Sequence, residues 1–454
     1  MSKERTIYTC QKCGGQFPKW MGRCTDCGEW NSLIEENYIT PSAVKNTRAT
    51  HKPASAVPQA LSEIDSTAGN HLPLGIAELD RVLGGGLVPA SAVLIGGDPG
   101  IGKSTIVLQM LSLARRQGRD VLYVTGEESA AQIKSRAVRL GVEKEPIDVV
   151  TENCLETILD LLKKNRRDLI VIDSVQTIYS QSLPSAPGTV SQVRECAGQL
   201  LQYCKSSGTT CLLIGHVTKE GSIAGPKVLE HMVDCVLYFE GDSGHNFRIL
   251  RAVKNRYGAT NEIGVFEMTG AGLREVPNPS EIFLAERPQG ASGSVVTAAL
   301  EGTRPVLLEV QALVSKSGLV NPRRTALGYD HNRLSLLVAV LEKVVGLHLY
   351  DQDIFLNLAG GLKVNEPALD LAACLAIYSS FRNQPIDPKT VILGEIGLTG
   401  EVRAISRADV RIKEAEKLGF QQMLLPAGNQ KGLETKKLKI LPVSNLSNAL
   451  SLLF

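Results

Sequence analysis

The sequence predicts an α/β protein whose central domain has a mostly parallel sheet, preceded by a small cysteine-rich module and followed by an α+β domain. Between residues 61 and 268, short apolar runs typical of buried strands alternate with helical patterns, as in parallel α/β folds. Two closely spaced cysteine pairs stand near the N-terminus. After the turn sequence "VPNPS", strand and helix patterns resume from about residue 279.

The composition excludes several classes of protein. The chain has 454 residues, enough for two or three domains of roughly 100–200 residues each. Its net charge is only +2, so a nucleic-acid site would have to be a local patch. No apolar run reaches the roughly 18–20 residues that cross a bilayer, and the start "MSKERTIYTC" lacks the apolar segment of a signal peptide. We therefore expect a cytoplasmic protein without membrane contact.

The N-terminal segment predicts a structural zinc site. Its cysteines have the spacing C-x2-C-x10-C-x2-C, with a glycine after each pair, and they are Cys10, Cys13, Cys24 and Cys27. Four thiolates complete a tetrahedral shell with no open position, as in zinc ribbons. We expect Trp20 and Trp30 to pack inside this module. The module either only stabilises the fold and binds no partner, or it contacts DNA or the next domain. The sequence favours neither alternative.

The strand–loop–helix sequence "SAVLIGGDPGIGKSTIVLQMLSLA" predicts a phosphate-binding loop. A buried strand, Ala92–Ile95, leads into the P-loop pattern G-x4-G-K-S and then into a helix. Backbone N–H groups at the helix start would bind phosphates, Lys103 would add a positive charge, and the Ser104 hydroxyl would bind Mg²⁺. The predicted nucleotide-binding residues of this loop are Gly97, Asp98, Pro99, Gly100, Ile101, Gly102, Lys103, Ser104 and Thr105.

Three other predicted strands end in polar residues suited to nucleotide hydrolysis. The apolar run Leu169–Ile172 ends in Asp173, a candidate to orient the metal, although a helix cap is an alternative role. "VLYVTGEES" ends in Glu127 and Glu128; we choose Glu127 as the base that orients water, although the chemistry excludes neither. "TCLLIGHV" ends in His216, either a γ-phosphate sensor or a structural residue.

These motifs resemble a known family. "GIAELDRVLGGGLVPASAVLIGGDPGIGKST" and the order of the strand-end residues resemble the core of RecA-family ATPases. Together with the cysteine pairs, the pentapeptide "KNRYG" and the C-terminal segment, the whole chain resembles the RadA (Sms) family of bacterial DNA repair proteins. Tyr257 stands where that family usually has Phe.

The resemblance implies a role for the two cations of "KNRYG". RecA-like motors form rings or filaments with ATP between subunits, and a neighbour's cations stabilise the charge that develops on the γ-phosphate. Lys254 and Arg256 lie two residues apart on a predicted strand and should project from one face. We expect them to act catalytically in the adjacent subunit. The alternative is a solvated basic hairpin.

The resemblance also implies DNA-binding loops. Their counterparts are residues 180–190, "SQSLPSAPGTV", and residues 218–227, "TKEGSIAGPK", the second of which carries Lys219 and Lys227. Small flexible loops with a few cations suit phosphate contacts without sequence preference, but ordinary surface loops have the same composition. Neither loop contains an aromatic residue.

The C-terminal segment resembles the proteolytic domain of Lon through "GGLKVNEPALDLAACLAIYSS" and "ILGEIGLTGEVRAISRADVRIKEAEKLGF". Ala368 stands where the catalytic serine would be, and Asp409 where the lysine would be, so we expect no proteolysis. Lon-type domains assemble into hexameric rings, which implies an oligomerisation platform. Three arginines nearby could bind DNA or form a solvated turn, and they are Arg323, Arg324 and Arg333.

Together these features predict a zinc ribbon at 1–36, a linker at 37–59, a RecA-like P-loop domain at 60–278 and an inactive Lon-protease-like α+β domain at 279–454. The expected cofactors are ATP, Mg²⁺ and Zn²⁺. By resemblance, the protein would be a DNA-dependent ATPase of recombination and repair. It would be a hexamer that translocates on single-stranded DNA and drives branch migration with a RecA-type recombinase. The alternatives are an ATP-switched recombination mediator and a protease, against which Ala368 stands.

Overall fold

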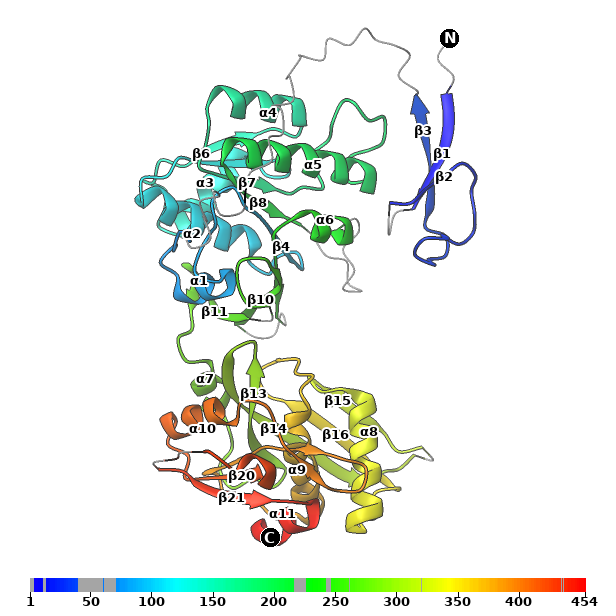
Figure 1. Cartoon of the computed structure of the whole chain (residues 1–454), viewed down its shortest axis with the longest axis vertical. Helices are drawn as coiled ribbons and strands as arrows, with labels where there is room; N and C mark the ends of the chain where they lie inside the picture. Colours follow the sequence, from blue (N-terminus) through cyan, green and yellow to red (C-terminus); the bar gives the residue numbers. More distant parts are fainter. Residues whose placement is uncertain are drawn as a thin grey trace. The chain divides into compact units, whose positions relative to one another are not determined.

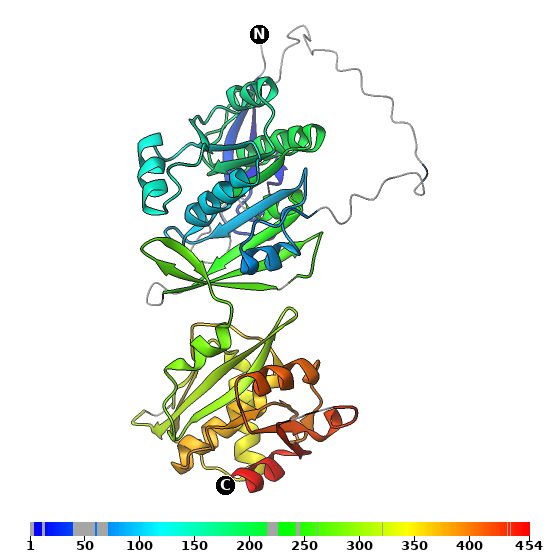
Figure 2. The ribbon, with the colours of Figure 1, turned by 90° about the vertical axis from the view of Figure 1, so that its left-hand side faces the viewer.

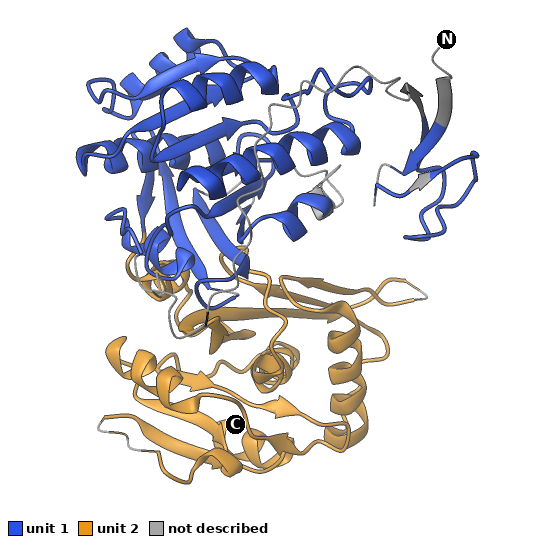
Figure 3. Ribbon diagram, turned by 45° about the horizontal axis from the view of Figure 1, so that its top comes forward, with its two compact units in different colours: residues 1–275 blue, residues 276–454 orange. Residues whose placement is uncertain are grey.

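The structure is a computed structural model of the whole chain, and it describes residues 4–10, 14–39, 60, 71–215, 226–241, 246–260, 262–319, 321–433, 435 and 437–454. Two compact units, residues 1–275 and 276–454, divide the chain (Figure 3). Each unit is described by itself below. No helix in these ranges combines the length and the apolar character needed to span a membrane.

The N-terminal module is a small antiparallel sheet with the strand order β2-β1-β3. Its strands are β1 (Glu4–Cys10), β2 (Gln16–Phe17) and β3 (Leu33–Ile39), so β3 continues into the segment predicted as a linker. Two cysteines and a leucine form its buried core, with Tyr8, Phe17 and Met21 packed against them. The expectation for the tryptophans was wrong, because Trp20 and Trp30 are 56% and 67% exposed. Smaller side chains already fill so thin a core.

The central domain is built on one large sheet (Figure 1). Among the described residues this sheet has nine strands in the order β12-β11-β10-β9-β4-β8-β7-β5-β6. From β9 to β6 neighbouring strands are parallel, and β10 to β12 extend the sheet antiparallel, which confirms the predicted mostly parallel α/β core. The strands are β4 (Ala92–Gly97), β5 (Val121–Thr125), β6 (Asp148–Thr151), β7 (Leu169–Asp173), β8 (Thr210–Ile214), β9 (Cys235–Glu240), β10 (Phe247–Asn255), β11 (Ile263–Thr269) and β12 (Gly272–Glu275).

Helices cover both faces of this sheet (Figures 1 and 2). Alternate residues of β4 enter two separate cores: Val93 and Ile95 pack with α1, α2 and α3, whereas Ala92 and Leu94 pack with α4, α5 and α6. Burial on both faces explains why these strands are apolar without alternation. The helices are α1 (Ala77–Leu83), α2 (Lys103–Arg116), α3 (Ala130–Arg139), α4 (Leu155–Lys164), α5 (Val190–Ser207) and α6 (Pro226–Met232).

Helix α2 is also attached to the far edge of the sheet. The side-chain amide of Gln109 donates to the carbonyl oxygen of Leu273 at 3.0 Å and accepts from its N–H at 3.2 Å. Leu273 lies in β12, the last strand before the second unit begins at Val276. The helix that follows the P-loop is therefore bonded directly to the strand that leads out of this domain.

The second unit has its own sheet, with the order β15-β16-β14-β13-β17-β20-β21, and a separate pair, β18-β19. The strands are β13 (Ser294–Glu301), β14 (Arg304–Lys316), β15 (Arg324–Leu327), β16 (Gln352–Leu358), β17 (Thr390–Ile392), β18 (Glu395–Ile396), β19 (Val402–Arg403), β20 (Gln422–Pro426) and β21 (Lys439–Val443). The helices are α7 (Pro279–Ala285), α8 (His331–Val340), α9 (Asp370–Arg382), α10 (Ala408–Lys417) and α11 (Leu446–Leu453). A π-helical turn, Leu341–Val345, extends α8. Helix α9 is mostly buried and packs on β13 and β14.

Candidate functional site

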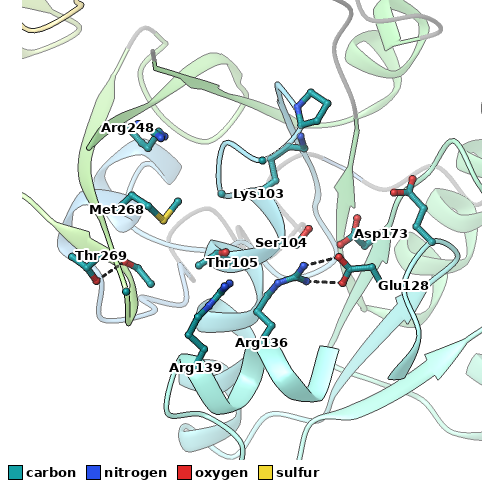
Figure 4. Close-up of a pocket in the computed structure, with 16 residues that line it drawn as sticks. Lys103, Ser104, Thr105, Glu128, Arg136, Arg139, Asp173, Arg248, Met268 and Thr269 are labelled. Carbon is teal, nitrogen blue, oxygen red and sulfur yellow. Dashed lines mark hydrogen bonds and ion pairs between the residues drawn. The ribbon is translucent and has the colours of Figure 1, made fainter. Parts of the chain in front are cut away.

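A cavity of about 530 Å³ opens where the parallel strands of the central sheet end (Figure 4). The P-loop forms one wall, the ends of β5 and β7 form another, and α3 and β10 to β12 supply the rest. The lining residues are Pro99, Gly100, Gly102, Lys103, Ser104, Thr105, Glu127, Glu128, Arg136, Arg139, Asp173, Arg248, Met268, Thr269, Gly270 and Gly272. Most of the predicted P-loop residues and both candidate carboxylates therefore share one cavity.

The P-loop folds around the ammonium group of Lys103. Its Nζ donates to the carbonyl oxygens of Gly97 at 2.6 Å and Asp98 at 2.9 Å, and the side chain is only 4% exposed. Gly102 precedes it with φ of 121°, and a Cβ there would lie 2.9 Å from the Cε of Met268. The backbone angle favours glycine at that position, whereas the Met268 methyl group ends a flexible side chain that could move aside.

The charge on Lys103 is balanced by its surroundings. Burial lowers the pKa of Lys103, whereas the nearby carboxylates of Asp173, Asp98 and Glu127 favour its charged form. Backbone N–H groups at the start of α2 add partial positive charge to the same place. The cradle therefore suits a polyanion such as a nucleotide triphosphate, with Ser104 and Asp173 as oxygen ligands for Mg²⁺.

Asp173 ends β7 inside the cavity and is 6% exposed. Its Oδ2 accepts a hydrogen bond from the hydroxyl of Tyr123, a fully buried residue of the adjacent strand β5. Burial and the Asp173 charge raise the pKa of Tyr123, which stays protonated and can only donate to Oδ2. The helix-cap alternative does not hold, because the next helix begins at Val190 after Thr189.

The two glutamates after β5 have different partners. Arg136 donates to both carboxylate oxygens of Glu128, at 2.6 and 2.8 Å (Figure 4). Glu127 is exposed to the cavity and accepts from the hydroxyl of Ser174, the residue after Asp173. The bidentate ion pair leaves Glu128 poorly placed to bind water, so the geometry favours Glu127 for that task.

Sequence reasoning missed the residues that hold these carboxylates. Tyr123 lies in an apolar strand where it reads as a core residue, although a buried tyrosine hydroxyl usually has a partner. Arg136 lies on α3, two turns after its N-terminal capping box, and no local pattern connects it with Glu128. Arg139 and Arg248 come from separate elements and also line the cavity.

Lys254 and Arg256 lie at the opposite end of the sheet from this cavity. The Nζ of Lys254, in β10, donates to the carbonyl oxygens of Glu230 at 2.6 Å and Val233 at 2.8 Å. Arg256 pairs at 3.1 Å with Asp234, which is buried and also accepts from the N–H of Ala92 at 3.0 Å.

The expectation that both cations lie on one strand and project from the same face needs correction. The register between β9 and β10 shifts between Ala252 and Lys254, and β10 ends at Asn255, so Arg256 lies beyond the strand. Both cations nevertheless contact the same segment, residues 230–234, between α6 and β9. A bulge changes which side chains share a face, and the sequence gives no sign of this one.

The rest of "KNRYG" anchors this segment on α1. The Asn255 side chain donates to the carbonyl oxygen of Val82 at 3.2 Å and accepts from the N–H of Tyr257 at 2.9 Å. Gly258 lies against Gly84, and a Cβ on either glycine would come within 2.9 Å of the other's Cα. Two backbones approach so closely only where neither carries a side chain. The pentapeptide is therefore a fixed structure with two cations at its surface.

The N-terminal cysteines converge as a metal site requires. The Sγ atoms of Cys10, Cys24 and Cys27 lie within 4.8 Å of one another, and those of Cys10 and Cys27 are 3.7 Å apart. Zinc bonds of about 2.3 Å in a tetrahedron place sulfur atoms about 3.8 Å apart, so this spacing fits zinc. Cys13, the fourth predicted ligand, lies outside the described residues.

Cys10 and Cys24, the first cysteines of the two pairs, each accept an equivalent backbone hydrogen bond. The N–H of Gly14 bonds to the carbonyl of Cys10, and the N–H of Gly28 to that of Cys24, at 2.8 and 2.9 Å. Such turns present thiolates and N–H groups together, so a metal would complete both halves of the module.

The predicted DNA loops are only partly described. In the first, the Gln192 side chain donates to the carbonyls of Ser180, Leu183 and Ser185, which fixes the loop and leaves Ala186–Gly188 exposed. His216 and residues 218–225 lie outside the described residues, as does the side chain of Lys227.

Two of the three candidate DNA-binding arginines form hydrogen bonds within the C-terminal unit. Arg333 donates to both carboxylate oxygens of Asp370, which is fully buried and also accepts from the Tyr329 hydroxyl at 2.6 Å. Arg324 donates to the carbonyl oxygen of Leu349 at 2.8 Å. Ala368 is 3% exposed in a 3-10 turn. The predicted arginine patch is therefore reduced to Arg323, the exposed member of the three.

Comparisons with known proteins agree with this architecture. Residues 8–35 match the rubredoxin metal-binding domain family, residues 72–149 the KaiC ATPase family, and residues 330–429 the family of subunit ChlI of Mg-chelatase. Over 452 residues the chain is 50% identical to the DNA repair protein RadA of Bacillus subtilis, covering 99% of both chains. The chain belongs to the RadA family. The RadA protein of Pseudomonas aeruginosa is 51% identical over 455 residues and is covered completely.

Membership in the RadA family settles the general role. This chain is a DNA repair protein with an ATPase domain, and the family supports ATP hydrolysis as its activity. The ATPase match implies a bound nucleotide and Mg²⁺, and the rubredoxin-type match with its cysteine cluster indicates zinc. Among solved structures, a KaiC-like protein of Pyrococcus horikoshii is 24% identical, with a TM-score of 0.39 over 46% of this chain and 99% of that one.

Tyr123→Phe tests the support of Asp173. Loss of the hydroxyl leaves the buried Oδ2 without its donor, so Asp173 is held less well for the metal. A hydrogen bond contributes about 0.5–1.5 kcal/mol, so the Mg²⁺ concentration for half-maximal ATPase should rise about twofold to tenfold. Tyr203→Phe is the matched control, because its hydroxyl bonds to the carbonyl of Leu162 away from the cavity. An unchanged Mg²⁺ requirement in Tyr123→Phe would contradict the assignment.

Cys24→Ser tests the metal centre. Zinc binding contributes about 10–16 kcal/mol to small zinc modules, more than so thin a core replaces. The variant should therefore lose its zinc, and residues 14–35 should become sensitive to protease, while ATP affinity is unchanged. Zinc content by elemental analysis and limited proteolysis are the measurements. Cys154→Ser, at a buried cysteine outside the cluster, should keep the metal. Equal zinc in both variants would argue against this site.

Proposed function

We propose that this protein is a DNA-dependent ATPase that works as a ring-shaped motor, hexameric by family resemblance, on single-stranded and branched DNA. The observation that carries the proposal is the separation of Lys254 and Arg256 from the nucleotide cavity of their own subunit. In a ring of identical subunits joined head to tail, each subunit presents one end to the next. Cations at that end would complete the neighbour's site.

The sheet register supports this geometry. Val93 of β4 pairs with Cys235 of β9, which pairs with Asn255 of β10. Gly97, where the P-loop starts, lies four residues further along β4, and at about 3.3 Å per residue this separates Asn255 from the P-loop by about 13 Å along the strands. Lys254 is level with Leu94, so the same rise per residue places it about 10 Å from the P-loop. This separation supports action between subunits.

The roles in hydrolysis follow from the contacts. Gly97 to Thr105 would hold the phosphates, with Lys103 compensating charge and with Ser104 and Asp173 binding Mg²⁺. Glu127, held beside Asp173 through Ser174, would orient the attacking water. The partner cations would stabilise charge that develops on the transferred phosphoryl oxygens, an effect worth about 10³–10⁵ in rate for arginine fingers.

The contacts of Lys254 also suggest how hydrolysis reaches DNA. Its ammonium group bonds to the carbonyls that end α6. The second predicted DNA loop, residues 218–227, includes the first two residues of α6. A Lys254 that turned toward a neighbour's phosphate would release these carbonyls, so nucleotide state and loop position would be linked. The first loop would add a neutral, preformed contact, fixed by Gln192.

The family resemblance supplies the finer function, which is branch migration of recombination intermediates with a RecA-type recombinase. The C-terminal unit would serve as the ring platform and not as a protease, because Ala368 has no hydroxyl and is buried. The second candidate is an ATP-switched mediator that binds DNA without translocating. It would use the same cavity but would not need repeated hydrolysis.

Strand displacement on a forked substrate separates the two candidates. A motor should displace the strand with ATP and fail with a non-hydrolysable analogue that supports binding. A switch should behave alike with both nucleotides, with DNA bound and no strand released. The Lys103→Ala variant controls for displacement that does not depend on the nucleotide.

Mixing of two variants tests action between subunits. Lys254→Ala should bind ATP but lose hydrolysis by about 10³-fold, the lower limit for such cations. Lys103→Ala should not bind ATP productively. In mixed rings, about a quarter of the interfaces would combine an intact P-loop with an intact Lys254, so DNA-stimulated ATPase should return partially.

Lys163→Ala is the control for mixing, because this lysine makes only an exposed pair with Asp160. When Lys163→Ala is mixed with Lys103→Ala, the DNA-stimulated ATPase activity should be no greater than the fraction of Lys163→Ala subunits in the mixture predicts. If Lys254→Ala and Lys103→Ala fail to complement although they assemble together, Lys254 acts within its own subunit or not at all.

A further inference from the structure

The zinc module exposes an aromatic surface that nothing in its described part covers. Trp20 and Trp30, both tryptophans of the chain, are more than half exposed, whereas Tyr8, Phe17 and Met21 pack against the core. Both indoles approach the same glycine, Gly22. A Cβ built on Gly22 would lie 3.8 Å from the Cη2 of Trp20 and also 3.8 Å from the Cζ3 of Trp30.

The backbone holds this surface in place. Arg23 and Trp30 pair across the hairpin that carries the second cysteine pair, and the N–H of Asn31 bonds to the carbonyl of Gly22 at 2.8 Å. Cys24 and Cys27 lie at the tip of that hairpin. A metal bound there would therefore fix the position of Trp30.

A cation accompanies the rings. The guanidinium carbon of Arg23 lies 5.8 Å from the ring centroid of Trp30, and its Nε donates to the carbonyl of Gly28 at 2.8 Å. Within the described ranges Arg23 forms no ion pair, and it is exposed, so its charge faces solvent beside the rings. Lys19, next to Trp20, is also exposed.

The geometry points to a base-stacking platform: Trp20 and Trp30 bind unpaired bases of single-stranded DNA, and Arg23 and Lys19 contact the adjacent phosphates. Adjacent aromatic rings with flanking cations are the chemistry by which proteins bind single strands without sequence preference. The inference deepens the proposed function, on which it rests. It supplies what the predicted pore loops lack, because residues 180–190 carry neither an aromatic nor a charged side chain.

A peptide is the competing occupant, since exposed tryptophans also anchor protein interfaces. The positions of the charges favour an anionic polymer: Arg23 contacts Trp30 and pairs with no carboxylate in the described residues, and Lys19 adjoins Trp20. The module also carries carboxylates, which are Asp26, Glu29 and Glu35. The two occupants differ in a measurable way. Stacking needs nucleobases, whereas a phosphate backbone without bases offers only charge.

Intrinsic tryptophan fluorescence of the full chain reports on Trp20 and Trp30 alone, because the chain has no other tryptophan. Unlabelled oligothymidylate should quench the emission, whereas an abasic strand of equal length should quench it much less. Anisotropy of a labelled strand, measured in parallel, reports whether the protein binds DNA at all. Replacement of both tryptophans by alanine should weaken binding about tenfold or more, and the Trp30→Phe variant should retain most of it. Zinc content controls for folding of each variant.

The outcomes separate the platform from the proposed function. Anisotropy that shows binding, with unchanged tryptophan emission and unchanged affinity in the double variant, overturns the platform and favours a peptide partner, while DNA binding elsewhere stands. Equal quenching by the abasic strand also overturns the platform, because the fluorescence change would then require only the phosphate charges and not the bases. Absence of any DNA binding overturns both proposals together.

Discussion

The central domain depends on two opposite charges buried at one edge of an apolar sheet. Lys103 and Asp173 are 4% and 6% exposed, and isolated charges at such depth are costly. Lys103 is compensated by P-loop carbonyls and by the nearby Asp173 carboxylate, and Asp173 also accepts from the Tyr123 hydroxyl. These contacts leave the cavity open. The site is thus charged and preorganised, as electrostatic stabilisation of a transition state requires.

The change of strand direction in the sheet gives the domain two functional ends. Parallel strands collect their carboxyl ends at the cavity, whereas the antiparallel β10 carries its last residues to the opposite end. Asn255 and the contact of Gly84 with Gly258 hold the backbone of "KNRYG" on α1. The side chains of Lys254 and Arg256 are bonded to residues 230–234 of the same subunit.

Local sequence patterns were sufficient for the P-loop, for Asp173 at a strand end and for paired cysteines, because each depends on residues a few positions apart. They failed where distant elements meet. The partner of Asp173 is Tyr123, 50 residues earlier, and Arg333 is bound by Asp370 across the C-terminal unit. The tryptophans were misplaced because apolar residues are expected inside, and a thin module has no space for them.

The two hydrogen bonds between Gln109 and β12 couple the position of α2 to that of the strand. The Gln109 side chain bonds both the N–H and the carbonyl group of Leu273, so a tilt of α2 would also displace β12. The C-terminal unit begins three residues after Leu273, at Val276. The chain therefore leaves the central domain from a strand whose position depends on the helix that follows the P-loop.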